Sequence, residues 1–269
     1  VDRLAAILDA EPENYDGFDN DGKSLKGDIE FRNVWFKYPK SEEYVLKNIS
    51  FTVKSGEQVA LLGPTGAGKS TVIALLTRFY EPEKGEIFID GIPLTEYSKA
   101  YLRGRIGAVL QNPFLFSTTI KQNISYALPD AAENDIIDAA KAASIHEIMH
   151  VFANGYDTLV GEKGVTLSGG QKQRVALART LLENPDILIL DDATSAVDTE
   201  TEFQIQQALK THLQDKTSFV IAHRMTSIQY ADKILVFENG GLIEQGRHKK
   251  LMAQNGFYRK VYDIQANVI

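Results

Sequence analysis

The sequence predicts an α/β fold in which a mostly parallel sheet carries helices on both faces. Over the last third of the chain, apolar runs that fit buried strands alternate with helical patterns. Such alternation is typical of a parallel sheet covered by helices. An earlier apolar run leads through a glycine-rich turn into another helical pattern, whose apolar positions are Val72, Leu75, Leu76 and Phe79. The strands predicted from residue 58 onward are 58–62, 85–91, 106–110, 187–190, 219–222 and 234–238, and a helix is predicted at 200–213.

Two further parts are expected around this sheet. Residues 29–36 and 45–53 mix polar and bulky side chains, so we expect a small, largely antiparallel β subdomain near the N-terminus. The pattern is helical over 130–154 and again over 171–182, where the helix stops before a proline. We expect these helices to form a second lobe, a helical subdomain at about 112–184.

The first 27 residues differ from the rest in composition and in the pattern of apolar residues. Val1–Ala10 places apolar residues on one helical face, and 14–26 is rich in Asp, Asn and Gly, which is typical of a linker. Because the chain begins at Val1 rather than methionine, we expect a piece of a longer protein. The predicted division is therefore 1–27 as a terminal helix and linker, and 28–269 as the main domain.

The composition narrows the function classes. Hydrophobic residues at 43% and charged residues at 24% are ordinary for a soluble globular domain. The net charge of −7 argues against nucleic acid as the main partner, since that partner normally needs a basic face. The absence of cysteine excludes a disulfide framework and a thiolate metal site. No apolar run approaches the length that crosses a bilayer, and no signal peptide is visible.

The glycine-rich turn lies between a strand and a helix, which is the context that a phosphate-binding loop requires. Its glycines allow backbone N–H groups to approach a phosphate chain, and the following helix points its positive end at the same anion. Lys69 supplies a positive charge for the β- and γ-phosphates, and Ser70 a hydroxyl for Mg²⁺. We predict a P-loop NTPase core that binds nucleotide through this turn. It comprises Gly63, Pro64, Thr65, Gly66, Ala67, Gly68, Lys69, Ser70 and Thr71.

A carboxylate follows the most apolar strand. Asp191 comes directly after four aliphatic residues, 187–190. In a parallel sheet the carboxyl ends of the strands line the ligand crevice, so Asp191 is expected beside the phosphate turn, where it would hold Mg²⁺. The simpler interpretation, that Asp191 only caps the next helix, loses weight because a phosphate loop lies upstream.

A second glycine turn opens onto a helix N-terminus, at Leu167, Ser168, Gly169, Gly170 and Gln171. It is an anion site without a lysine. One nucleotide does not need two such turns from one chain, so this turn is expected to serve a nucleotide held by another chain. Ser168 is also expected to cap its own helix.

These motifs, taken in order, resemble the nucleotide-binding domain of an ABC transporter, most closely the multidrug and lipid exporter group. The resemblance covers about 28–262 and includes the Walker A turn, the signature 167–171 and Walker B at 187–191. The N-terminal segment is similar to the connector that follows the last transmembrane helix. Further matches are Gln111 as the Q-loop glutamine, Ser195 and Asp198 in the D-loop, His223 as the switch histidine, Tyr38 as the adenine-stacking aromatic, and Val160–Gly164 as the loop before the signature.

The resemblance implies a role for each matched residue. Tyr38 would offer its ring face to adenine, although a tyrosine near a strand end is otherwise packing. Gln111 would ligate or hydrate Mg²⁺ and report on the γ-phosphate. His223 would contact the γ-phosphate or position the attacking water. Catalysis would then rest on Lys69, Gln111, His223 and the residue after Walker B, with ATP and Mg²⁺ as ligands.

The residue after Walker B departs from the family pattern. The family usually has glutamate there to orient or deprotonate the attacking water, whereas this chain has Asp192. The aspartate carboxylate is drawn back by about 1.5 Å, and a misplacement of that order costs about a hundredfold in rate. We therefore expect tight Mg-ATP binding and weak hydrolysis at this chain's own site.

An intact signature beside an altered glutamate resembles one half of a heterodimeric exporter. In such proteins two domains hold two ATP molecules head to tail, and the other half carries the catalytic glutamate. The expected partners are thus a second, non-identical nucleotide-binding domain and the transmembrane domains, at the cytoplasmic face of a membrane, with no nucleic acid. Two alternatives remain: a homodimer that hydrolyses ATP slowly, and an aspartate at position 192 that was introduced by engineering.

Three other function classes share some of these features. A soluble ABC-type ATPase acting on nucleic acid or the ribosome is disfavoured by the acidic charge and by the lack of a heptad run between Walker A and the signature. A regulatory module that binds nucleotide without hydrolysis would suit Asp192. An importer subunit is disfavoured by Val160–Gly164 and by the connector. The transported substrate is set by membrane helices outside this sequence.

Overall fold

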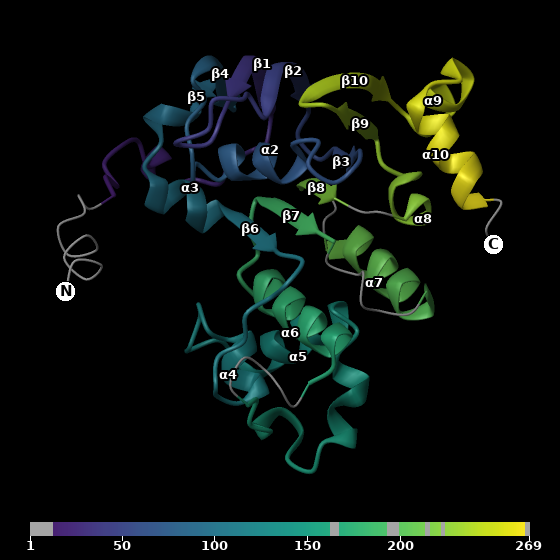
Figure 1. The fold of residues 1–269 in the computed structure, drawn as a ribbon. Coiled ribbons are helices and arrows are strands. Elements are labelled where there is room, and N and C mark those ends of the chain that lie inside the picture. Colours follow the sequence, from purple (N-terminus) through teal and green to yellow (C-terminus); the bar gives the residue numbers. More distant parts are fainter. Residues whose placement is uncertain (1–12, 162–166, 193–198, 213–215, 222–223, 267–269) are drawn as a thin grey trace.

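The computed structural model describes residues 13–161, 167–192, 199–212, 216–221 and 224–266. Within those residues the chain forms two sheets with helices between and beside them (Figure 1). The smaller sheet is antiparallel and has the strand order β2-β1-β4-β5. Its strands are β1 (Ile29–Phe36), β2 (Leu46–Val53), β4 (Lys84–Ile89) and β5 (Ile92–Pro93). The predicted antiparallel β subdomain is thus confirmed, with two strands that follow the phosphate turn added to it.

The larger sheet has the order β10-β9-β3-β8-β7-β6 within the described residues. All neighbouring pairs from β9 to β6 are parallel, and β10 adds an antiparallel edge. The strands β3, β7 and β8 bury every residue or nearly so, as continuous apolar runs require. The mostly parallel sheet is therefore confirmed. Its strands are β3 (Gln58–Leu62), β6 (Ile106–Val109), β7 (Ile187–Asp191), β8 (Thr217–Ile221), β9 (Lys233–Glu238) and β10 (Gly241–Gly246).

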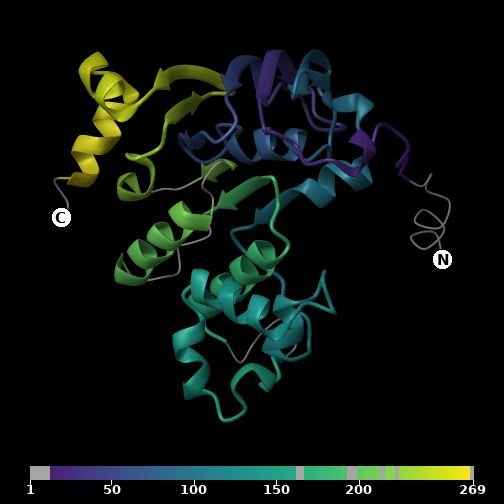
Figure 2. The same ribbon diagram turned by 180° about the vertical axis from the view of Figure 1, so that it is seen from behind.

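Helix α2 (Lys69–Leu76) lies between the two sheets (Figures 1 and 2). Its apolar side chains pack in one core cluster with residues of β1, β2, β3 and β4, so the helix that follows the phosphate turn is fixed from two sides. Val72, Leu75 and Leu76 are fully buried in it. The other helices beside the sheets are α3 (Lys99–Arg105), α7 (Thr199–His212), α8 (Met225–Ile228), α9 (His248–Gln254) and α10 (Phe257–Ala266).

The helices between β6 and β7 gather on the side of the large sheet away from the small one (Figures 1 and 2). Arg179 ties them together, because its guanidinium donates to the carbonyl and to the side-chain oxygen of Asn123 at 2.7 and 2.8 Å. The helical pattern predicted for this stretch is present, whereas the boundaries 112–184 stay a prediction. The elements are α4 (Ile120–Ile124), α5 (Glu133–Ala142), the 3₁₀ turns η3 (His146–Val151) and η4 (Gly155–Asp157), and α6 (Gly169–Leu182).

The stretch predicted to be a linker with little to bury is bound to the domain surface. The N–H of Phe18 donates to the Glu96 carbonyl at 2.7 Å, and the N–H of Ser98 donates to the Phe18 carbonyl at 3.0 Å. Leu25 is only 5% exposed. Composition could not predict this binding, because most of the hydrogen bonds of the stretch use its own backbone N–H and C=O groups, which every sequence has. A short 3₁₀ turn, η1 (Asn20–Gly22), lies within the stretch.

Phe79 differs from its prediction. We expected it on the apolar face of the helix after the turn, but α2 ends at Leu76 and Phe79 is 66% exposed. The helix ends because Arg78 adopts a left-handed conformation with φ 54°, which breaks the helical path. Among the described helices, none has the length and apolar character to cross a membrane.

Candidate nucleotide-binding site

The turn between β3 and α2 requires glycine at two points. A side chain at Gly63 would bring its Cβ within 2.2 Å of the Phe237 carbonyl oxygen, and one at Gly68 within 2.5 Å of the Leu46 side chain. Gly68 also has φ 104°, a conformation that glycine adopts most easily. At Gly66 a Cβ would meet nothing within 4 Å, so this part of the turn faces open space. The backbone is therefore packed against the protein on one side and accessible on the other.

Lys69 is the first residue of α2 and is nearly buried, with 7% of its surface exposed. Its ammonium donates to the carbonyls of Gly63 and Pro64 at 2.7 and 2.9 Å, so it lies within the curve of the turn. Burial lowers the pKa of Lys69, while the nearby charges of Asp191 and Asp192 oppose that shift. The result is a buried cation surrounded by backbone oxygens at a helix N-terminus, which suits a polyanion.

A pocket of about 420 Å³ opens over this turn. It brings together residues that the sequence predicted to meet, because β3 and β7 both end here in the parallel sheet. The adjoining strand β6 delivers Gln111 to the same edge. The residues that line the pocket are Tyr38, Val45, Thr65, Gly66, Gly68, Lys69, Ser70, Thr71, Gln111, Asp191, Asp192 and Ile221.

Asp192 is held at the edge of this pocket by two hydrogen bonds. Its N–H donates to the Ile221 carbonyl at 2.8 Å, which continues the pairing of β7 with β8. Its carboxylate accepts from the side-chain amide of Gln111 at 3.2 Å. The backbone of Asp192 has φ 51°, a left-handed conformation that aspartate tolerates better than most residues. Gln111 and Asp192, the residue after 187–191, are thus in direct contact.

Gln173 is a site residue that sequence reasoning missed. It lies on α6 and is 3% exposed, and its side-chain amide donates to the carbonyls of Gln111 and Asp192, each at 3.3 Å. The helix that begins at the signature therefore reaches the back of the pocket. The only available signal was the position of Gln173 one half-turn beyond a recognised motif, which does not by itself predict a contact.

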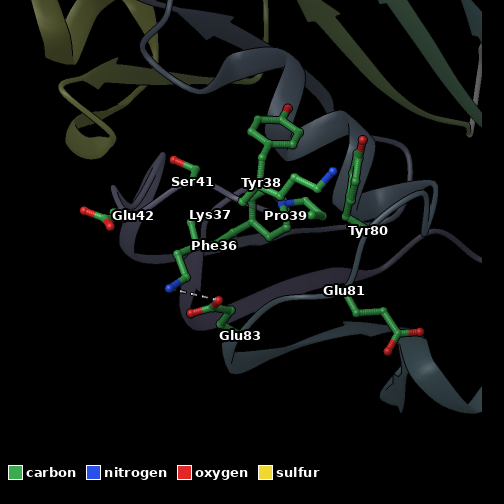
Figure 3. A pocket seen from close by; sticks show the side chains of 10 residues that line it. Phe36, Lys37, Tyr38, Pro39, Ser41, Glu42, Tyr80, Glu81 and Glu83 are labelled. Atoms are coloured by element: carbon green, nitrogen blue, oxygen red, sulfur yellow. Dashed lines mark ion pairs between the residues drawn. The ribbon is translucent and has the colours of Figure 1, made fainter.

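Tyr38 also lines the pocket and is half-buried. Its hydroxyl is 3.0 Å from Oγ1 of Thr71, at the start of α2. Its ring also lines a second pocket of about 560 Å³, on the side of Tyr80 (Figure 3). The ring therefore forms a wall between two open spaces.

The signature turn lies apart from this pocket. Ser168 and Gly169 are exposed, and the described residues that line the pocket include none from 167–171. Ser168 caps α6 as predicted: its hydroxyl accepts from the N–H of Gln171 at 3.3 Å, and the side-chain oxygen of Gln171 accepts from the Ser168 N–H at 2.9 Å. Leu167 is buried.

Some predicted site residues lie outside the described part of the chain. These are the D-loop residues Ser195 and Asp198 and the switch histidine His223. In the loop before the signature only its first two residues, Val160 and Gly161, are described, and Val160 is buried.

The donors in the pocket fit ATP with Mg²⁺. The turn offers a cation and backbone N–H groups for the phosphates. The Ser70 hydroxyl, the Gln111 side chain and the Asp191 carboxylate all line the pocket and are hard oxygen donors, which Mg²⁺ prefers. The aromatic ring of Tyr38 lines the same pocket. Ring, cation and oxygen donors are thus present in one cavity.

Comparisons with known proteins agree with this site. The sequence profile of the family described as "ABC transporter" matches residues 46–195. An uncharacterized ABC transporter ATP-binding protein of Bacillus subtilis is 53% identical over 243 residues, which is 90% of this chain and 42% of that protein. An ATP-dependent lipid A-core flippase of Haemophilus influenzae is 49% identical over 263 residues, 97% of this chain and 45% of the flippase.

A solved structure supports the same assignment. A bacterial ABC exporter with ATP bound superposes with a TM-score of 0.89 at 42% identity, covering 96% of this chain and 44% of the exporter. The chain therefore spans less than half the length of the relatives it matches. Turn, pocket and profile together lead to one conclusion: the chain belongs to the ABC transporter family as an ATP-binding domain, an ATPase that uses ATP with Mg²⁺.

Proposed function

We propose that this chain drives the export of a substrate across a membrane by ATP-dependent dimerisation with a second nucleotide-binding domain. The relatives named as a flippase and an exporter support this assignment. Residues 28–269 act as the ATPase domain, and 1–27 connects it to transmembrane domains. The domain works at the cytoplasmic face of the membrane. The acidic net charge of −7 gives no support to a nucleic-acid partner.

Within the pocket, each lining residue has a distinct task. Lys69 and the turn N–H groups bind the phosphates, and the Tyr38 ring stacks on adenine. Ser70, Gln111 and Asp191 hold Mg²⁺, which neutralises charge on the phosphates when bound. Asp192 accepts a hydrogen bond from the attacking water, and His223 donates toward the γ-phosphate.

The position of the signature turn, residues 167–171, is the observation that supports the proposed dimer. Its exposed turn caps α6, a helix of 14 residues, yet it contributes nothing to the described lining of the chain's own pocket. A capped helix N-terminus exposed in this way is an anion site that needs a nucleotide from elsewhere. A head-to-tail pair of domains supplies one, since each signature then closes the pocket of its partner.

Asp192 limits hydrolysis at this chain's own site. Its carboxylate is one methylene shorter than glutamate and is already engaged by Gln111 at 3.2 Å. A base that is drawn back by about 1.5 Å reaches the water poorly. We therefore propose a non-identical partner that carries the glutamate, whose competent site is completed by Leu167–Gln171 of this chain.

An exposed aromatic cluster beside Gln111 provides a contact surface for the transmembrane domains. Phe114 and Tyr126 are 57% and 54% exposed, and Phe116 stacks on Tyr126 with ring centroids 4.0 Å apart. Arg179 lies over Phe116, which links this surface to α6 and so to the signature turn. Closure of the dimer can reach the membrane through this cluster.

Cysteine cross-linking tests the head-to-tail dimer, and the chain suits it because its sequence has no cysteine. Thr65→Cys and Ser168→Cys are made as single variants and mixed at high concentration under oxidation. Both complementary surfaces belong to this chain, so a disulfide-linked pair is expected with Mg-ATP and not without nucleotide. A mixture of Ser168→Cys with Lys249→Cys, a surface position, is the matched control. Absence of an ATP-dependent link at every concentration would contradict the proposal.

A further inference from the structure

Helix α2 holds Tyr38 from both of its ends. Near its N-terminus, Oγ1 of Thr71 lies 3.0 Å from the Tyr38 hydroxyl. Just beyond its C-terminus, the ring of Tyr80 lies perpendicular to the Tyr38 ring, with centroids 5.1 Å apart and an interplanar angle of 89°. Edge-to-face geometry of this kind is favourable for aromatic pairs. One helix therefore links the phosphate turn to the tyrosine that lines the pocket.

The end of α2 is shaped so that Tyr80 reaches this position. Arg78 has φ 54°, and the N–H groups of Phe79 and Tyr80 both turn back to the Ala74 carbonyl, at 2.9 and 3.4 Å. The next segment is fastened to β1, because the N–H of Glu83 donates to the Trp35 carbonyl at 2.9 Å. The turn is thus closed on both sides of Tyr80, and its ring is carried on rigid backbone.

A third ring completes the support. Phe36, at the end of β1, is 3% exposed and lies 5.0 Å from Tyr38 and 5.5 Å from Tyr80, measured between centroids. The side of Tyr38 that faces Tyr80 borders the pocket of about 560 Å³ (Figure 3). Without the Tyr80 ring, the space beside Tyr38 would be wider. Its ring could then swing out of the nucleotide pocket.

We propose that Tyr80 is a positioning residue for recognition of the nucleotide base. It acts through Tyr38 by keeping that ring at a fixed distance from the phosphate turn, so that base and phosphates are bound at the same time. The ligand is a nucleoside triphosphate with a planar base. This inference rests on the proposed stacking of adenine on Tyr38. No hydrogen bond of the Tyr80 hydroxyl is needed for the role, only the ring.

Two ligands separate this role from a general effect on the site. Binding of Mg-ATP and of magnesium tripolyphosphate, which has no base, is measured for the 269-residue chain and for Tyr80→Leu and Tyr80→Phe. We expect Tyr80→Leu to weaken ATP binding by roughly 2- to 12-fold, the value of an aromatic pair. Tripolyphosphate binding should stay unchanged, and Tyr80→Phe should bind both ligands normally. Tyr80→Gln repeats the test in case the leucine variant does not fold.

Tyr38→Leu and the double variant Tyr38→Leu/Tyr80→Leu show whether the effect passes through Tyr38. The double variant should bind ATP no more weakly than Tyr38→Leu alone. Phe79→Leu, next in the chain and 66% exposed, is the matched control and should bind ATP normally.

The outcomes distinguish the proposed role of Tyr38 from the proposed role of Tyr80. If Tyr38→Leu leaves ATP binding unchanged, the proposed role of Tyr38 is wrong, and this inference falls with it. If Tyr38→Leu weakens ATP binding but Tyr80→Leu does not, only the role of Tyr80 is wrong. Equal weakening of ATP and tripolyphosphate by Tyr80→Leu would also overturn it, because that result indicates damage to α2 rather than to base recognition.

Discussion

The side-chain amide of Gln111 donates to the carboxylate of Asp192, with 3.2 Å between the nitrogen and the oxygen. This bond joins Gln111, two residues after β6, to the residue after β7, and both residues line the pocket. Asp192 is further held by its N–H bond to Ile221 and by a left-handed backbone. Its carboxylate is thus fixed by neighbours rather than free to extend toward a water molecule. The short side chain and its restraint are the basis of the weak hydrolysis proposed above.

Replacement of Lys69 separates binding from stability. Lys69→Met removes a charged donor from the phosphate turn, and we expect ATP binding to weaken by about 10- to 100-fold, the value of 1.5–3 kcal/mol for a charged hydrogen bond. Burial lowers the pKa of Lys69, so folding disfavours its charged form, which offsets the loss of its bonds to the Gly63 and Pro64 carbonyls; the urea concentration of unfolding should therefore change little. Calorimetric titration and urea unfolding measure the two effects.

Lys249→Met is the control for that experiment, since Lys249 is exposed. It should change neither quantity. Normal ATP binding by Lys69→Met would contradict the assignment of the turn as the phosphate site.

Removal of the Gln173 amide should destabilise the protein. Gln173→Leu leaves the part-buried carbonyls of Gln111 and Asp192 without this donor, and loss of such a hydrogen bond costs about 0.5–1.5 kcal/mol. We expect the free energy of unfolding, measured with urea, to fall by that amount. Gln204→Leu is the comparison, because Gln204 is exposed on α7 and its replacement should cost little. An equal loss in both variants would show that the Gln173 contacts contribute nothing.

The contact of Glu13 with Arg103 and Lys99 predicts a pH effect on the bound N-terminal stretch. Those side chains lower the pKa of Glu13 from 4.5 to about 2. Because the pKa is lower in the folded state, the contact stabilises above pH 4.5 and is lost as the pH falls toward about 2. The N–H groups of Phe18 and Ser98 should lose protection from hydrogen exchange over that range.

The same measurement on two variants tests the cause. Glu13→Gln should show reduced protection at neutral pH and no further loss on acidification. Glu133→Gln, whose partner Lys121 is 3.7 Å away in the helical part, should behave like the parent chain. The effect should be small and should weaken with added salt, since Glu13 is at the surface. Unchanged protection in Glu13→Gln would mean that the other hydrogen bonds hold the stretch without Glu13.

The sequence predicted those parts of the site that follow strand ends. Asp191 and the turn at Gly63 could be placed together because parallel strands finish at one edge of a sheet, and the structure brings them together. Contacts made by the flanks of helices could not be predicted. Gln173 contacts the backbone of Gln111 and Asp192, and Tyr80 contacts the ring of Tyr38, through tertiary packing that periodicity does not report.

The same distinction explains the fold. Periodicity identified the buried strands β3, β7 and β8, whose apolar runs are continuous. It did not reveal that β4 joins the small sheet, because that pairing crosses the phosphate turn and α2. The binding of the stretch around Phe18 was missed for a related reason, since backbone bonds leave no mark on residue type.

Steady-state ATP hydrolysis by the parent chain and by Asp192→Glu, measured across protein concentration, tests the central claim most directly. We expect slow turnover in the parent and much faster, concentration-dependent turnover in Asp192→Glu, by up to about a hundredfold, because a carboxylate misplaced by about 1 Å costs that much. The additional change His223→Ala should abolish the gain. Brisk hydrolysis by the parent as a self-dimer, with little gain in Asp192→Glu, would contradict the weak site and favour two identical halves.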